Sequence, residues 1–391
     1  MIRSLEDYNF KGKKVFIRVD FNVPIKDGKI LDDTRIKEAV KTIEYVKNSG
    51  GRVILASHLG RPKGKCLEEF SLKLVSKYIN DNFFKLMFVE DCIGKKVLEA
   101  TDKLNNGEIL LLENLRFYSG EEANSEEFVN ELLKFTDIYV NDAFGTSHRK
   151  HASVYGLPLK VKEKCAGILM FKEINYFEKI LKNPDKPFGA IIGGAKVKDK
   201  IGVIESLLNH VNKVFIGGAM AYTFLAAKDK KVGNSLVEKN QFGTVETIFK
   251  KAEENSVEIF LPIDHVCSDK FCGEPVYVNS IDIPENLMGL DIGDKTIALY
   301  ERELKNCKTI LWNGPMGVFE DKRYSKGTFE IAKTLAKIDA TVVVGGGDSV
   351  SAVKEINIQD KISHISTGGG ASLEYIELGT LPGIEALKQG N

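Results

Sequence analysis

The stretch Thr341-Val342-Val343-Val344-Gly345-Gly346-Gly347-Asp348-Ser349 runs from consecutive apolar residues into three glycines and an acidic residue. Unbroken apolar residues are typical of a strand that is buried on both faces of a parallel sheet. The glycines predict a turn into a helix, where backbone N–H groups and the positive end of the helix dipole bind anions. The carboxylate of Asp348 is suited either to capping this helix or to holding Mg²⁺ beside phosphates.

Two further glycine turns repeat this pattern, at Gly193-Gly194-Ala195-Lys196 and at Gly368-Gly369-Gly370-Ala371. Each follows an apolar run and precedes a helical pattern, so we expect the turns to converge on the phosphates of a nucleotide. Lys196 and Lys200 lie four residues apart at a predicted helix start. We therefore expect them on one helix face, where both could reach the same phosphate chain.

Apolar runs alternate with amphipathic segments along the whole chain, which predicts an α/β fold with parallel sheets covered by helices. At 391 residues two domains are expected. A helix-like stretch ends at Asn183-Pro184-Asp185-Lys186-Pro187, because closely spaced prolines cannot continue a helix, and it marks the boundary. The predicted strands are Lys14–Val19, Arg52–Ala56, Glu108–Leu112, Asp137–Val140, Phe188–Ile192, Lys213–Ile216, Glu258–Leu261, Thr309–Trp312, Thr341–Val344 and Ile362–Ile365.

Arginines in the first half stand beside polar or turn-forming residues, several of them just past an apolar run. One such arginine is usually a surface residue, but several at successive strand ends converge on the same crevice. Their forked guanidinium groups suit a small phosphorylated acid, and the side chains of Asp20 and Asn22 suit its hydroxyls. Together with the glycine turns they predict a phosphoryl-transfer enzyme. These arginines are Arg18, Arg35, Arg61, Arg116 and Arg149.

The composition excludes several other classes of function. Lys+Arg and Asp+Glu are equal at 55 each, which is unlike a dedicated nucleic-acid binder or a polybasic membrane binder. The start of the chain has no signal-peptide core and no window approaches a membrane span, so we expect a cytoplasmic protein. The six scattered cysteines predict reduced thiols, and His265, Cys267 and Cys272 lack the second ligand pair of a zinc site.

Standard nucleotide motifs are incomplete. The pattern G-x-x-x-x-G-K-[ST] is absent, and Val350 and Leu373 occupy the last glycine position of G-x-G-x-x-G after the two late turns. A nicotinamide-dependent oxidoreductase is therefore disfavoured, although it would explain Rossmann-like halves. A nucleotide-binding module without catalysis is the other alternative, but it needs none of the arginines. Asp20-Phe21-Asn22 resembles a protein-kinase motif without its His-Arg-Asp partner.

Taken together, the sequence closely resembles the phosphoglycerate kinase family. The resemblance implies two Rossmann-like parallel-sheet domains joined by a hinge helix. These are a 3-phosphoglycerate-binding domain at 1–170, a hinge helix and linker at 171–187, a nucleotide-binding domain at 188–372 and a tail at 373–391 that returns to the first domain. It also implies a monomer. The matching stretches are RVDFNVP (18–24), SHLGRP (57–62), LLENLRF (111–117), NDAFGTSHR (141–149), GGAKVKDKI (193–201), GGAMAYTF (217–224), LDIG (290–293), WNGPMGVFE (312–320), GGGDS (345–349) and STGGGA (366–371).

The resemblance also implies the site residues and the reaction. The acyl phosphate of 1,3-bisphosphoglycerate would pass reversibly to ADP, giving 3-phosphoglycerate and ATP, with Mg²⁺ accompanying the nucleotide. Arg35 and Lys200 would be catalytic, and Asp348 would face the metal. The residues implied for 3-phosphoglycerate are Asp20, Phe21, Asn22, Arg35, His58, Leu59, Gly60, Arg61, Arg116 and Arg149. Those implied for the nucleotide are Lys196, Lys200, Gly217, Gly218, Gly289, Leu290, Asn313, Glu320, Gly346, Gly347, Asp348 and Ser349.

Overall fold

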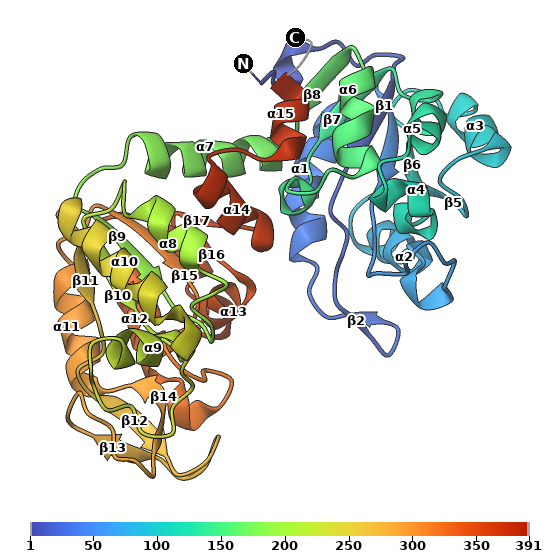
Figure 1. Ribbon diagram of the computed structural model, residues 1–391. Coiled ribbons are helices and arrows are strands. Elements are labelled where there is room, and N and C mark those ends of the chain that lie inside the picture. The colour runs from blue at the N-terminus through green and yellow to red at the C-terminus, as the bar shows by residue number, and fades with distance from the viewer. Residues whose placement is uncertain (1, 389–391) are drawn as a thin grey trace. The chain divides into compact units, whose positions relative to one another are not determined.

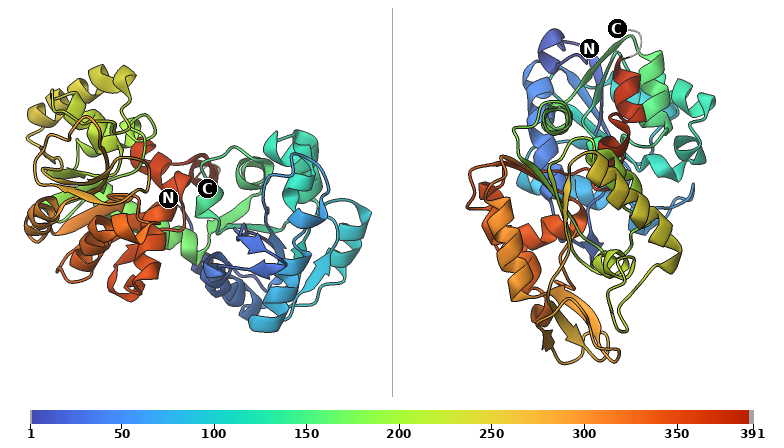
Figure 2. Two further views of the ribbon diagram at one scale, coloured as in Figure 1. Left: turned by 90° about the horizontal axis from the view of Figure 1, so that it is seen from below. Right: turned by 60° about the vertical axis from the view of Figure 1, so that its left-hand side comes forward.

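The structure is a computed structural model that describes residues 2–388. The chain divides into two units, one formed by the residues up to Asn175 together with those from Thr380 onward, the other by Tyr176–Gly379. The division falls within the helix α7 (Ile168–Lys182), which ends directly before the proline-containing segment 183–187. Each unit has a six-stranded parallel sheet with helices on both faces (Figures 1 and 2). The predicted fold class is confirmed.

The sheet of the first unit has the strand order β5-β6-β4-β1-β7-β8. Helices α1 and α2 bury an apolar stripe against it through residues such as Ile43 and Val75, which pack with Ile17 and Leu55 of the strands. Its strands are β1 (Lys14–Arg18), β4 (Arg52–Ala56), β5 (Met87–Val89), β6 (Ile109–Leu112), β7 (Ile138–Asn141) and β8 (Glu163–Ala166), with a small hairpin of β2 (Ile25–Lys26) and β3 (Lys29–Ile30). Its helices are α1 (Thr34–Asn48), α2 (Lys73–Asn82), α3 (Lys95–Asp102), α4 (Ser119–Glu122), α5 (Glu126–Leu133), α6 (Leu157–Lys160) and α15 (Pro382–Lys388).

The sheet of the second unit has the order β11-β10-β9-β15-β16-β17. The chain leaves β9 toward one edge and later resumes on the other side of β9, so β9 and β15 flank the switch point where ligands bind in such sheets. Its strands are β9 (Phe188–Ile192), β10 (Lys213–Ile216), β11 (Glu258–Phe260), β15 (Thr309–Asn313), β16 (Thr341–Gly345) and β17 (His364–Ile365). Its helices are α8 (Ile201–Leu207), α9 (Met220–Ala226), α10 (Phe242–Glu254), α11 (Asp294–Leu304), α12 (Lys326–Leu335), α13 (Gly347–Glu355) and α14 (Gly370–Leu378).

The second unit also contains an antiparallel sheet that the sequence analysis did not predict. Its strands are β12 (His265–Ser268), β13 (Val276–Val278) and β14 (Met288–Ile292), in the order β13-β12-β14. Cys267 lies within β12 and is buried, whereas Cys272 is half-buried in the following turn. No helix among residues 2–388 combines the length and the apolarity needed to cross a bilayer.

Candidate functional site

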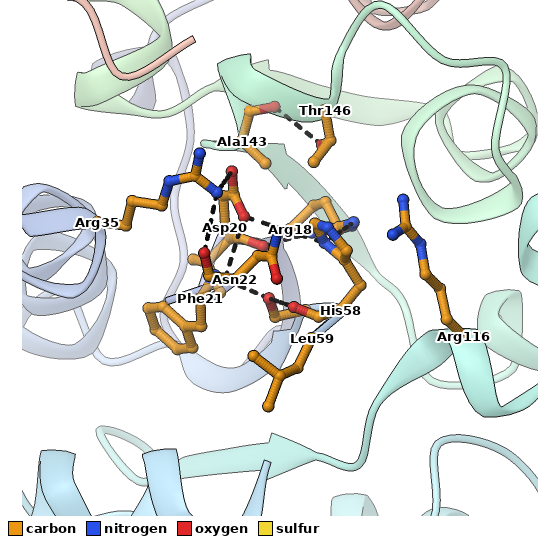
Figure 3. A network of polar contacts seen from close by, with 12 residues as sticks. Arg18, Asp20, Phe21, Asn22, Arg35, His58, Leu59, Arg116, Ala143 and Thr146 are labelled. Carbon is orange, nitrogen blue, oxygen red and sulfur yellow. Dashed lines mark hydrogen bonds and ion pairs between the residues drawn. The ribbon is translucent and has the colours of Figure 1, made fainter. Parts of the chain in front are cut away.

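The segment after β1 is held by a chain of polar contacts in the first unit (Figure 3). Arg35, from the first turn of α1, places Nη1 2.9 Å from Asp20 Oδ2 and donates to the main-chain oxygen of Asn22 at 3.1 Å. Asn22 Oδ1 in turn accepts the N–H of Gly60 at 2.9 Å. These contacts join the loop after β1 to the loop after β4, as expected where parallel strands end at one edge of a sheet.

His58 is buried at the end of β4 beside Arg18. Arg18 Nη2 lies 3.3 Å from His58 Nδ1, while Asp20 Oδ1 is 4.0 Å from the same nitrogen. Burial holds the pKa of His58 well below its ordinary value, and the charges of Arg18 and Arg116 lower it further. His58 is therefore a neutral imidazole at physiological pH.

Arg116 contributes a buried cation from the 3-10 helix after β6. Its Nη1 donates to the main-chain oxygen of Gly60 at 2.8 Å, and its Nε is 3.3 Å from Glu122 Oε1. Burial lowers the pKa of Arg116 to about 10, and Glu122 opposes this shift. The guanidinium group therefore stays charged at neutral pH, as an anion site requires.

Two further histidines lie beside the arginines of this unit. Arg149 Nε donates to His148 Nε2 at 3.1 Å. Burial lowers the pKa of His148 to about 4 and that of His151 to about 3, and the neighbouring guanidinium charges of Arg149 and Arg116 act in the same direction. Both imidazoles are therefore neutral at pH 7, and the arginines carry the positive charge of the region.

The structure thus brings most of the predicted residues of the first unit into one network, made of Asp20, Asn22, Arg35, His58, Gly60 and Arg116. Phe21 and Leu59 are buried between these polar residues, and their side chains contribute packing. Arg61 is exposed directly after Gly60, and Arg149 is half-buried against His148.

Arg18, Glu121 and Ser153 are not among the site residues that the family resemblance implies. Arg18 ends β1, inside the predicted strand Lys14–Val19, and its side chain is fully buried. Glu121 stands in the charged stretch Gly120-Glu121-Glu122-Ala123-Asn124, which is typical of a solvated surface. The burial of Glu121 and its contact with Ser153, 32 positions away, show that its carboxylate is internal.

In the second unit a cavity of about 380 Å³ opens at the carboxyl ends of β9, β15, β16 and β17. All three glycine turns predicted from the sequence reach it, together with the loop after β15. The cavity is lined by Gly193, Gly194, Ala195, Lys196, Asp199, Lys200, Asn313, Gly314, Pro315, Gly346, Gly347, Asp348, Gly369, Gly370 and Leu373. Helices α13 and α14 begin at Gly347 and Gly370, so two positive helix ends meet this space.

The glycines of this cavity have two different roles. A Cβ atom on Gly193 would meet the oxygen of Pro315 at 2.0 Å, and one on Gly314, whose φ is +100°, would meet the oxygen of Gly193 at 2.2 Å. These glycines let two loops pack main chain against main chain. By contrast, a Cβ on Gly347, Gly369 or Gly370 would meet no atom within 4 Å, which leaves open space beside the helix starts.

The expectation that Lys196 and Lys200 share a helix face is wrong. α8 begins only at Ile201, and Lys200 is its N-cap residue. The carboxylate of Glu238 accepts the N–H groups of Val197 at 2.6 Å and Lys198 at 3.3 Å, which holds 196–200 as a loop. Both lysines nevertheless line the cavity.

Lys200 and Asn313 form the polar floor of this cavity. Lys200 Nζ donates to Asn313 Oδ1. Burial lowers the pKa of Lys200, while the negative charges of Asp348 and Asp199 favour its protonated form. Asn313 Nδ2 is buried and has no hydrogen-bond partner in the part of the chain that the structure describes, so it is a donor that a ligand oxygen would satisfy.

Asp348 lies in the first turn of α13 and is exposed, and the N-cap of this helix is Gly346. Asp348 therefore does not occupy the N-cap position of α13. Ser349 is fully buried, and its Oγ accepts the N–H of Gly314 at 2.6 Å, so it supports the loop after β15. Glu320 is exposed at the far end of that loop.

Four residues that the resemblance implies for the nucleotide lie outside the lining of this cavity: Gly217, Gly218, Gly289 and Leu290. A Cβ on Gly218 would meet the main chain of Gly194 at 2.6 Å, and one on Gly217 would meet Met316 Sδ at 2.4 Å. Gly289 packs against the hydroxyl of Tyr222 and donates to Ser235 Oγ at 2.9 Å. Leu290 is buried in β14, next to Gly289.

The cavity fits a phosphate chain with Mg²⁺. Its donors are two lysine ammonium groups, an unpartnered amide and two helix starts, all suited to anionic oxygens. Asp348 offers one exposed carboxylate, and Mg²⁺ beside phosphates is commonly held by one or two carboxylates. Among residues 2–388 no three His, Cys, Asp or Glu side chains form a group that could hold a metal by itself.

The chain has two α/β units, each built on a parallel sheet. One unit has an arginine-rich network and the other a glycine-lined cavity, so fold and site define a class of two-unit α/β proteins with two candidate anion sites. Comparison with known proteins identifies the family within this class. The family model described as phosphoglycerate kinase matches residues 5–378. The chain belongs to the phosphoglycerate kinase family.

Similar proteins cover the chain almost completely. Phosphoglycerate kinase of Borrelia turicatae is 49% identical over 391 residues, which is 99% of this chain and 100% of the relative. That of Anaeromyxobacter dehalogenans is 48% identical, with the same coverage. The structure of phosphoglycerate kinase from Coxiella burnetii matches with a TM-score of 0.92 and 38% identity, covering 100% of this chain and 99% of the other. The enzyme from Pyrococcus horikoshii matches with a TM-score of 0.87, 34% identity and coverage of 99% and 98%.

Proposed function

We propose that this chain catalyses the reversible transfer of the acyl phosphate of 1,3-bisphosphoglycerate to ADP, giving 3-phosphoglycerate and ATP in glycolysis and gluconeogenesis. The observation that carries the proposal is the family match over residues 5–378. The cavity at the glycine turns and the arginine network of the first unit support it, because such a phosphotransferase needs two anion sites.

The first unit is the proposed 3-phosphoglycerate site. Arg116 and Arg35 hold permanent positive charge, and Asp20 and Asn22 offer acceptors for a hydroxyl group. His58, Gly60, Arg61 and Arg149 complete the set, with Phe21 and Leu59 packed beneath the polar groups. Because forked guanidinium groups bind phosphate and carboxylate oxygens in fixed directions, this arrangement would orient the phosphorylated acid.

The second unit is the proposed nucleotide site. The starts of α13 and α14, Gly346, Gly347, Lys196 and Lys200 would take the phosphates, and Asn313 Nδ2 would donate to a phosphate oxygen. Gly217, Gly218, Gly289 and Leu290 would lie near the adenine, Glu320 near the ribose, and Ser349 would support the phosphate loop. Mg²⁺, faced by Asp348, would supply charge neutralisation on the phosphate oxygens.

The reaction needs no general base, because the carboxylate and the terminal phosphate of the nucleotide are already anionic. The protein's task is to align the reacting oxygens and to stabilise negative charge on the moving phosphoryl group. Arg35 and Lys200 are the proposed catalytic cations. Burial keeps Lys200 away from bulk water, where its charge would be screened, and Asp348 and Asp199 favour its protonated state.

We further propose domains at 1–170 and 188–372, with 171–187 as a hinge-bending helix and linker and 373–391 as a tail that returns to the first domain. The grouping of residues from Thr380 onward with the first unit supports the tail, since Gly383 donates to the oxygen of Ser147 at 2.8 Å. A monomer in the cytoplasm is proposed from the family resemblance.

A coupled assay tests the function directly. ADP formation from ATP is followed with Mg²⁺ present, with and without 3-phosphoglycerate. We expect ADP to form only when 3-phosphoglycerate is supplied. An equal rate without it, or no rate with it, would refute the proposed reaction.

A further inference from the structure

Glu121 and Arg18 are two buried charges that the proposed reaction does not use. Neither side chain has any exposed surface. Ser153 connects them, because its Oγ donates to Glu121 Oε1 at 2.6 Å and accepts from Arg18 Nε at 2.8 Å. The N–H of Ser153 also donates to Glu121 Oε2 at 2.9 Å. Buried charges are tolerated when they are paired and hydrogen-bonded, so Glu121, Ser153 and Arg18 form one buried triad.

This buried triad fixes the plane of the Arg18 guanidinium group. Its Nε is held by Ser153 Oγ, and its Nη1 donates to the main-chain oxygen of Val19. The hydroxyl of Tyr139 donates to the main-chain oxygen of Ser153 at 2.8 Å, which holds Ser153 itself. Because a guanidinium group is planar and rigid, two fixed nitrogens determine where Nη2 lies. That position is 3.3 Å from His58 Nδ1.

The contact with Nη2 decides which nitrogen of His58 carries the proton. Every guanidinium nitrogen is a donor and none accepts, so the neutral imidazole must offer the lone pair of Nδ1 and carry its proton on Nε2. Asp20 Oδ1 is the other group near Nδ1, but it is 4.0 Å away and accepts the N–H of Asn22 at 3.2 Å. The contacts therefore favour one tautomer.

We propose that Glu121, acting through Ser153 and Arg18, is a positioning residue that holds His58 as the Nε2–H tautomer, so that His58 offers a hydrogen-bond donor to oxygens of the phosphorylated acid. The proposal rests on the proposed role of His58 in binding this substrate. Burial and the neighbouring guanidinium groups, which lower the pKa of His58, keep the ring neutral.

Nitrogen NMR of the free full-length protein tests the tautomer without any substrate. Long-range ¹H–¹⁵N spectra, with His58 assigned by its loss in His58→Gln, distinguish a protonated Nε2 from a protonated Nδ1. We expect the wild type to be protonated at Nε2. In Ser153→Ala and Glu121→Gln we expect a mixture of the two tautomers. A wild-type ring protonated at Nδ1, or an unchanged tautomer in both variants, would overturn the proposal.

Kinetics provide the second readout. Both variants should raise the KM for 3-phosphoglycerate about threefold to tenfold, as the loss of one hydrogen bond implies, and leave the KM for ATP unchanged. Ser76→Ala is the matched control, since it removes another buried hydroxyl of the first unit and should change neither value. If Ser153→Ala does not fold, the wild-type spectrum and Glu121→Gln still decide. A wild type that fails to bind 3-phosphoglycerate would refute the proposed function but leave the tautomer measurement intact.

Discussion

Arg35 Nη1 lies 2.9 Å from Asp20 Oδ2 and also donates to the main-chain oxygen of Asn22. Both contacts use Nη1, so the edge of the guanidinium group formed by Nε and Nη2 is the edge that a ligand oxygen would meet. The side chain of Arg35 is 34% exposed, whereas that of Asp20 is 9% exposed. Asp20 thus anchors a cation that remains accessible.

Replacing Arg35 tests this arrangement. Arg35→Ala should lower kcat/KM for 3-phosphoglycerate by about a hundredfold or more, because the proposed donor to the developing negative charge is lost. Arg35→Lys should recover only part of the activity, since an ammonium group lacks the planar fork. Arg3→Ala, at an exposed position of the same unit, should match the wild type. Activity of Arg35→Ala within threefold of the wild type would remove Arg35 from the mechanism.

Lys200→Ala should separate turnover from binding. We expect kcat to fall by about a hundredfold or more, because a partly buried cation beside the glycine-lined cavity is lost, with little change in the affinity for 3-phosphoglycerate. Steady-state kinetics and calorimetric titration measure the two quantities. Lys198→Ala, two residues away on the same loop and exposed, is the control. An unchanged kcat in Lys200→Ala would contradict its catalytic role.

Acidification should destabilise the protein through His151. Burial lowers the pKa of His151 to about 3, while the unfolded value is near the ordinary 6.5. Between these values the unfolded chain binds the additional proton, so stability falls as the pH falls from about 6.5 toward 3, by at most about 1.4 kcal/mol per pH unit for one group.

His151→Gln removes this titration. Urea denaturation at pH 7 and pH 5 should show a smaller loss of unfolding free energy in His151→Gln than in the wild type, whatever constant offset the substitution adds. His210→Gln, at a less buried histidine of the second unit, should leave most of the wild-type pH dependence in place. Equal pH dependence in the wild type and His151→Gln would contradict the prediction.

Gly383 of α15 lies too close to its neighbours to accept a side chain without a shift. A Cβ at this position would meet Val154 Cγ1 at 2.8 Å and Ser147 Cβ at 3.0 Å, so Gly383→Ala should cost about 1–3 kcal/mol of unfolding free energy. Gly243→Ala is the matched control in α10, where a Cβ would meet no atom within 4 Å and the helix should gain about 0.5–1 kcal/mol. Thermal and urea unfolding compare the two. Equal stability would show that α15 can shift to make room.

The parallel sheets could be predicted from the sequence because their strands are local apolar runs. Arg52–Ala56, Phe188–Ile192 and Lys213–Ile216 have the predicted bounds. β5 and β8 were missed because Met87–Val89 is short and Glu163–Ala166 includes charged residues. The antiparallel sheet was missed for a related reason, since β12 (His265–Ser268) and β13 (Val276–Val278) are too short to show a clear strand pattern.

The candidate site was predictable where a local motif carries the function and unpredictable where the contact is long-range. The glycine turns predicted the cavity, and the arginines of the first half predicted the network around Asp20. Glu238 is 41 positions from Val197, yet its carboxylate determines that 196–200 is a loop rather than a helical turn. Glu121 and Ser153 likewise depend on a contact between distant segments, for which spacing in the sequence gives no signal.

The contact between Gly193 and Gly314 has a consequence for engineering. Where two loops touch through carbonyl oxygens and Cα atoms, a single substitution at either glycine would force the loops apart. The wall of the cavity is therefore closed to redesign at these positions. Attempts to retune the chain toward another nucleotide would have to work from residues farther out, such as those around Tyr222 and Leu290, and a mutant library that spares the two glycines should retain more folded members.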